Sequence, residues 1–273
     1  MKFFLSNRSA VAGLFVLIVI ILAALFAGLI APHDPWSTVG RPLSVPGSEF
    51  LLGSDSLGRD IYSGILHGAR VSLLIGVAAA TISVFIGVVV GLLAGYLGGR
   101  TNDFLMAFTE IVQTIPSFVL MVVLVAIFQP SITSIIIAIA VVSWPPLARL
   151  VRGEVMTLRT REFVEAARLN GLSETHIMFR EILPNCASHI IVMGSLMIAN
   201  AILMESAMSF LGLTDPNVMT WGYMIGSSRA MLHFAWWTCV FPGFAIFVTV
   251  LAINLVGEGI NDAFNPKLAK QRA

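Results

Sequence analysis

Long apolar blocks alternate with short polar segments along most of this chain. A helix needs about 20 mainly apolar residues to cross the hydrocarbon core of a bilayer. Six blocks approach or exceed that length, and they occupy residues 10–30, 71–99, 104–128, 131–148, 190–213 and 234–256. The pattern therefore predicts an all-α, polytopic membrane protein with six transmembrane helices.

The first block has two interpretations. Residues 10–30 carry no charge and follow Lys2 and Arg8, which is also how a secretory signal begins. The apolar part of a signal peptide spans only about 7–15 residues, however. The 21 residues of this block favour a retained anchor helix.

A polar segment, residues 32–70, separates the first two blocks. Four prolines lie in its first part. Its second part places Ile61, Ile65 and Leu66 on one face of a helix. We expect an external loop followed by a short amphipathic helix along the membrane surface. The chain then divides into residues 1–69 (anchor helix, loop and surface helix), 70–257 (transmembrane core with a polar loop at 150–185) and 258–273 (tail).

The second block contains Gly87, Gly91 and Gly95, a double G-x-x-x-G pattern. Small residues at this spacing let another transmembrane helix approach closely. The pattern predicts helix packing but leaves open whether the partner helix belongs to this chain or to another subunit.

Residues 150–185 form a polar island in this apolar sequence. Eleven of the chain's 31 charged residues lie in it or at its edge: Arg149, Arg152, Glu154, Arg159, Arg161, Glu162, Glu165, Arg168, Glu174, Arg180 and Glu181. Asn170 and Gly171 suit a helix end, and Ser173 suits the N-cap of a second helix. Pro184 is expected to end that second helix.

The first of these helices has the chemistry of a docking surface. Phe163, Ala166, Ala167 and Leu169 offer apolar contacts among interleaved charges. A helix that is merely solvated would show the same pattern, so the residues alone leave both interpretations open.

The basic residues predict the orientation, because they accumulate on the cytoplasmic side of membrane proteins. With both termini inside, the outer segments hold four: Arg41, Arg59, Arg70 and Arg229. The inner segments hold twelve: Lys2, Arg8, Arg100, the six island arginines, Lys267, Lys270 and Arg272. We therefore expect a cytoplasmic island.

Composition excludes several functions. The chain is 57% hydrophobic and 11% charged, and its net charge of +1 gives no basic surface for nucleic acid. It has no G-x-x-x-x-G-K-[ST] motif and no hydrolase or zincin motif, so we expect no nucleotide, catalytic or metal site of its own. Cys186 and Cys239 lack metal-ligand spacing and are expected to be small apolar fillers.

Two acidic residues, Glu110 and Glu205, fall inside apolar blocks. Charge in a bilayer is costly, so such residues are functional candidates. The alternative is a structural carboxylate, paired or protonated, that faces the helix bundle.

The island carries a recognisable motif. Its pattern EAA-x3-G followed by Leu-Pro resembles the cytoplasmic loop of permease subunits of ATP-binding cassette importers. The matching residues are Glu165, Ala166, Ala167, Gly171, Leu183 and Pro184. The resemblance implies a type I importer permease fold, with a coupling helix between helices 4 and 5 that seats in a groove of an ATPase subunit.

Other segments resemble the second permease of the peptide and nickel branch. They are LGSDSLGRD at 52–60, SFLGL at 209–213 with Trp221-Gly222, and NLxGxG at 254–259. The departures from the family pattern are Thr214, Val218, Glu258, Asn265, and Glu181 followed by Ile182.

The resemblance implies a permease that imports di- or oligopeptides across a bacterial inner membrane, with nickel as the alternative cargo. It also implies a second permease subunit, two ATPase subunits that bind ATP and Mg, and an external solute-binding protein. Surrounding lipid is a further contact, and no cofactor is expected on this chain. From another class, an ATPase-independent secondary transporter or channel would need paired charges or broken helices near mid-membrane. A structural membrane anchor would leave the island unexplained.

Overall fold

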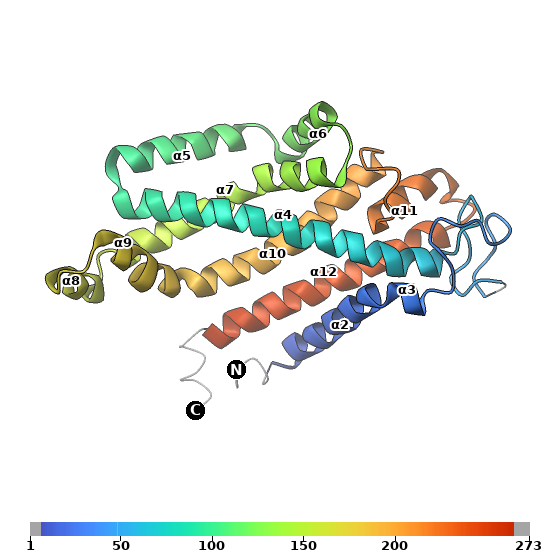
Figure 1. Cartoon of the computed structure of the whole chain (residues 1–273), viewed down its shortest axis with the longest axis horizontal. Coiled ribbons are helices and arrows are strands. Elements are labelled where there is room, and N and C mark those ends of the chain that lie inside the picture. Colours follow the sequence, from blue (N-terminus) through green and yellow to red (C-terminus); the bar gives the residue numbers. More distant parts are fainter. Residues whose placement is uncertain (1–6, 48, 265–273) are drawn as a thin grey trace.

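The computed structural model describes residues 7–47 and 49–264, and these residues form an elongated bundle of helices (Figure 1). The α-helices are α2 (Arg8–Leu25), α3 (Ala27–Ile30), α4 (Ile61–Leu97), α5 (Gly99–Thr114), α6 (Ser117–Phe128), α7 (Ile132–Leu158), α8 (Glu162–Leu169), α9 (Glu174–His176), α10 (Leu183–Phe210), α11 (Trp221–Ser228) and α12 (Trp237–Phe264). Two short segments of other helical type are η1 (Ile177–Ile182) and η2 (Arg229–Met231). The expected all-α class is confirmed.

Five helices in the described part of the chain are long and apolar enough to cross a membrane. They are α2, α4, α7, the continuous helix from Glu174 to Phe210, and α12. A sixth candidate is the pair α5 and α6, which are bent by 83° at the break between them. The crossing predicted over residues 104–128 is therefore a bent pair of helices and not one straight helix. Pro116 explains the break, because a proline lacks the N–H of a helical turn and disfavours helical geometry at the residue before it, here Ile115.

The surface helix expected after the external loop does not exist as a separate element. α4 runs without interruption for 37 residues from Ile61. The side chain of Asp60 caps it by accepting hydrogen bonds from the backbone N–H groups of Tyr62 and Ser63. Ile61 and Leu66 are buried in the bundle, so the apolar face that predicted a surface helix packs against protein.

The glycine pattern of α4 lies against α7 of the same chain. A Cβ atom at Gly87, Gly91 or Gly95 would meet the backbone of α7 at van der Waals overlap. The nearest carbonyl oxygens would be those of Trp144, Ala148 and Arg152, at 3.0, 2.5 and 2.8 Å. The sequence left the partner of this face open, and the structure assigns it to α7.

Pro184 does not end the second island helix, contrary to expectation. The helix continues from Glu174 through η1 and α10 to Phe210. The segment η1 has π-helical geometry, in which the N–H of Leu183 bonds to the carbonyl of Met178, five residues back. Pro184 follows directly after this wider turn, at the start of α10, and the chain stays helical through it.

The two ends of the bundle differ (Figure 1). The loop of residues 31–60 lies at one end, and α8 lies at the other. The start of α2 and the end of α12 both point away from the loop end, and they meet where Asn7 Nδ2 donates to Asp262 Oδ2 at 3.0 Å. α12 extends two turns beyond the expected crossing, and residues 265–273, with Asn265 and the basic tail, lie outside the described residues.

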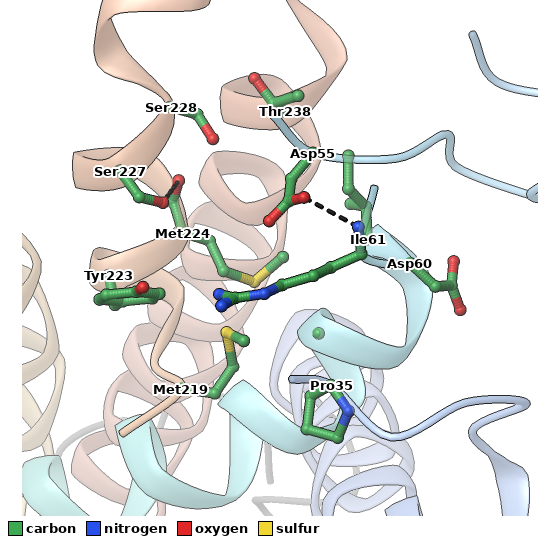
Figure 2. A pocket seen from close by; sticks show the side chains of 12 residues that line it. Pro35, Asp55, Asp60, Ile61, Met219, Tyr223, Met224, Ser227, Ser228 and Thr238 are labelled. Carbon is green, nitrogen blue, oxygen red and sulfur yellow. Dashed lines mark hydrogen bonds between the residues drawn. The ribbon is translucent and has the colours of Figure 1, made fainter. Parts of the chain in front are cut away.

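At the loop end, residues 31–60 close over α11 and the start of α12. Figure 2 shows Met219, Tyr223 and Met224 on one side of a narrow pocket and Asp55 and Ile61 on the other. The pocket volume is about 10 Å³, which is room for about one water molecule. It is therefore a packed seam and not a cargo site.

Candidate functional site

The polar island presents α8 beyond the ends of two long helices. α7 continues to Leu158 and the next long helix begins at Glu174, so both helices extend into the island. α8 closes with a Schellman motif, in which the N–H of Leu172 bonds to the carbonyl of Ala167 at 3.2 Å. Gly171 makes this turn possible with a φ of +75°. Ser173 then caps the next helix by accepting from the N–H of His176.

One face of α8 is packed into the chain's own core. Val164 is fully buried and Ala167 is 7% exposed. They belong to a cluster that contains Val155 of α7 and Ile177 and Ile182 of η1. Ala167 therefore packs within the chain and does not face a partner, which differs from its expected place on the docking surface.

The other face of α8 has no covering from the described residues. Glu165 and Ala166 are exposed, Phe163 is 39% exposed and Leu169 is 89% exposed. We call these four residues the coupling face. Exposed apolar side chains grouped at a protruding tip mark an interaction surface. Of the two remaining motif residues, Leu183 is half-buried at the start of α10 and Pro184 is exposed.

Polar contacts join α8 to its neighbours. Nε of Arg168 lies 3.7 Å from Oε1 of Glu174, and the hydroxyl of Tyr96 donates to Oε2 of the same carboxylate. The ion pair is exposed, so its own contribution to stability is small. Tyr96 belongs to α4 and is only 7% exposed, so its hydrogen bond to Glu174 connects α4 to α9.

Two island arginines brace the helix ends below α8. Arg159 Nη1 donates to the carbonyls of Gly95 and Tyr96, at 3.4 and 2.9 Å. Arg152 Nε donates to the side chain of Asn102. In the sequence these two arginines are visible only as charge, and their bracing roles were not predicted. The partners are 50 to 64 positions away in the sequence, so no local pattern indicates them. The burial of Val164 was also not predicted. Its three-residue spacing from Ala167, which places both on one helix face, could have indicated it.

Glu205 is fully buried and surrounded by hydroxyl donors. The hydroxyls of Thr220 and Ser209 donate to its Oε1 at 2.7 and 2.8 Å, and Ser206 donates to Oε2 at 3.4 Å. The Thr220 hydroxyl also accepts from the N–H of Tyr223 and so caps α11. This arrangement joins α10 to α11 and matches the structural alternative for Glu205.

Glu110 lies in a different environment, on an exposed face of α5. Within the described residues, no hydrogen bond or ion pair joins it to Glu205. The same part of the chain contains no group of three or more His, Cys, Asp or Glu side chains that could hold a metal ion.

The fold has a counterpart among solved structures. It resembles a chain of the inward-facing MetNI methionine ABC transporter with a TM-score of 0.63, at 16% sequence identity, over 74% of this chain and 96% of that one. A second crystal form of the same transporter gives a TM-score of 0.61 with the same coverage. At this identity the likeness shows the fold.

Sequence comparisons then give the family. The family described as "Binding-protein-dependent transport system inner membrane component" matches residues 87–270. "N-terminal TM domain of oligopeptide transport permease C" matches residues 1–41. The chain belongs to the family of binding-protein-dependent transport system inner membrane components, and the resemblance drawn from the island is confirmed.

Relatives match almost the whole chain. The di/tripeptide transport system permease protein DppC of Pseudomonas aeruginosa (strain UCBPP-PA14) is 42% identical over 97% of this chain and 90% of its own length. The dipeptide permease DppC of Alkalihalophilus pseudofirmus is 39% identical, over 96% and 87%. The oligopeptide permease OppC of Bacillus subtilis (strain 168) is 36% identical, over 98% and 88%.

Proposed function

We propose that this chain is the membrane-spanning permease subunit of an ATP-driven importer of di- or oligopeptides. The three relatives named above are all described as peptide permeases. None of them is described as a nickel permease, so peptides are the favoured cargo. The chain itself would bind no cofactor, and ATP and Mg would be held by the partner ATPase subunits.

The two-sided packing of α8 is the observation that carries the coupling proposal. Its inner face is fixed among Val155, Ile177 and Ile182, and its outer face presents Leu169 to a partner. A close-packed core transmits displacement with little compression. A partner that moves the coupling face would therefore also move α7 and the long helix that contains α10.

The mechanism follows from this rigid connection. Closure of two ATPase subunits on ATP would displace α8, tilt α7 and α10, and open the pathway toward the outside. Hydrolysis would release the ATPases and return the helices. The cargo would arrive from an external solute-binding protein at the loop end, and a second permease subunit would complete the pathway.

The orientation follows from the distribution of basic residues. The α8 end would face the cytoplasm, with both termini on that side of a bacterial inner membrane. α8 would then meet ATPase subunits in the compartment that contains ATP.

A substitution on the coupling face tests the proposal. Leu169→Asp would place a charge where an apolar side chain is expected to be buried by the ATPase. Burial of a leucine side chain is worth about 1.5–3 kcal/mol, or roughly a 10- to 100-fold change in affinity. We expect the variant to insert normally, to lose the ATPase subunits on purification in mild detergent, and to lose uptake.

The matched control is Leu51→Asp, which changes a 68% exposed leucine at the loop end. It should retain the ATPase subunits. Normal ATPase binding by Leu169→Asp would contradict the coupling role of α8. Uptake driven by an ion gradient without any ATPase would contradict the importer itself and favour a secondary transporter or channel.

A further inference from the structure

One face of α5 carries a polar stripe through an apolar region. Its members are Glu110, Gln113 and Thr114, followed by Ser117 at the start of α6, and all are exposed. A separate face of α5 carries the exposed apolar side chains Phe104, Phe108 and Ile111, and Ile115 follows in the same direction. The two faces lie roughly 130° apart at the 100° per residue of an α-helix. The helix therefore presents water-compatible and lipid-compatible surfaces in different directions.

The depth of Glu110 in the membrane limits what its exposed carboxylate can face. It lies six residues after Phe104, where the apolar block begins, or about 9 Å at the rise of an α-helix, which is inside a hydrocarbon core of about 30 Å. No hydrogen bond or ion pair reaches its carboxylate from the described residues. A charged side chain that faces lipid costs about 2.5–3.5 kcal/mol at the centre of the core and less toward the interface. The carboxylate must therefore face water or another chain.

The helical hydrogen bonding of α5 ends about one turn after Glu110. α5 ends at Thr114, and Pro116 has no N–H, so the carbonyl of Val112 lacks its usual donor four residues later. The carbonyl end of a helix carries a partial negative charge. At membrane depth, such irregular backbone is tolerated where it lines a water-filled cavity or is buried in protein.

We propose that Glu110, with Gln113 and Thr114 on the same face of α5, forms a binding site in the translocation pathway for the α-ammonium group of the transported peptide. This inference rests on the proposed function, which supplies a peptide as cargo. The site combines a carboxylate with the hydroxyl and amide oxygens of the stripe, which are acceptors for the three N–H donors of an ammonium group. A continuous polar stripe favours a hydrated pathway over a dry contact with the second permease.

Transport by the complete importer tests the site. The second permease, both ATPases and the solute-binding protein are reconstituted with each variant in proteoliposomes, and dipeptide uptake is measured per ATP hydrolysed. For Glu110→Gln we expect this ratio to fall about 10-fold, the effect of a lost hydrogen bond to a charged group. ATP hydrolysis by the assembled complex should stay within about twofold of wild type.

Two further variants control this result. Glu110→Asp keeps the carboxylate and should recover most of the uptake. Asp103→Asn removes an exposed carboxylate seven residues earlier on the same helix, outside the stripe, and should behave like wild type. If Glu110→Gln left uptake unchanged, or lowered complex assembly, hydrolysis and uptake together, the inference would be overturned. The second pattern would assign Glu110 to a contact with the partner permease.

Chemical labelling gives an independent readout. In a variant whose two native cysteines are replaced, Glu110→Cys should react with a membrane-impermeant, cationic methanethiosulfonate, and a dipeptide with its binding protein should slow that reaction. Phe108→Cys, on the apolar face, should not react. Absence of labelling or of protection at position 110 would overturn the inference. A wild-type complex that transports no peptide would instead overturn the proposed function.

Discussion

Arg159 Nη1 lies 2.9 Å from the carbonyl oxygen of Tyr96, so the guanidinium that follows the last turn of α7 closes the carbonyl end of α4. The last carbonyls of a helix have no intrahelical donor, and a cation there is favoured by the helix dipole. The contact fixes the ends of α4 and α7 together directly below α8.

Removing this contact should loosen the helix ends that support α8. Arg159→Ala loses hydrogen bonds to two carbonyls, and because the side chain is half-buried we expect a loss of about 1–2 kcal/mol in stability. The measurement is the thermal unfolding temperature of the purified complex, with uptake per ATP hydrolysed as the functional readout. Arg161→Ala, an exposed arginine two positions away, is the control and should unfold like wild type.

Gly171→Val should disturb the geometry of the α8 turn without a steric clash. A Cβ at Gly171 meets nothing within 4 Å, but its φ of +75° is strongly disfavoured for a β-branched residue. We expect strain of about 1–3 kcal/mol, a displaced α8, and reduced uptake and substrate-stimulated ATP hydrolysis in a chain that still inserts.

Gly153→Val is the matched control for that variant. A Cβ at Gly153 would also meet nothing within 4 Å, but the φ of Gly153 is not in the left-handed region. Coupling should remain normal in this control. Normal coupling in Gly171→Val as well would show that the positive φ does not matter for function.

Gly91→Ala should separate α4 from α7. The new methyl group would lie 2.5 Å from the carbonyl oxygen of Ala148 and 2.8 Å from Cβ of Val151, so a backbone must shift. Overpacking of this kind costs about 1–3 kcal/mol. Thermal unfolding should report the loss, whereas Gly243→Ala, with nothing within 4 Å, should leave stability unchanged.

Glu205 should respond to loss of its acceptor oxygens more than to loss of its charge. Glu205→Ala leaves the hydroxyls of Ser209 and Thr220 without their partner in a buried site, at about 1–3 kcal/mol. Glu205→Gln retains an acceptor oxygen and should be milder in thermal unfolding. If both variants abolished uptake at unchanged stability, Glu205 would be a functional carboxylate.

The membrane-spanning pattern and the position of the coupling loop could be predicted from the sequence because their signals are local. Hydrophobicity over about 20 consecutive residues determines which segments enter a bilayer. The turn at Gly171 and the cap at Ser173 depend on a few neighbouring residues, and both lie where the motif placed them.

Pro116 itself signals a break in the helix, but the apolar character of residues 104–128 led us to predict a single crossing there. A helix can accommodate a proline or can end at it, and both outcomes occur in this chain. Pro184 follows a π-helical turn and the helix continues, whereas Pro116 ends α5 and the chain bends by 83°. Which of the two outcomes occurs depends on how the surrounding residues pack. A local sequence pattern does not contain that information.

Length, apolar spacing and charge placement alone identify an all-helical membrane protein with a polar loop at its basic end. The tertiary structure decided which face of each helix is used. It packs Gly91 against α7, turns Ala167 inward, encloses Glu205 in hydroxyls and leaves Glu110 exposed. These outcomes depend on contacts between residues dozens of positions apart, because a helix in a membrane can be apolar on every side and its sequence then does not say which side meets protein.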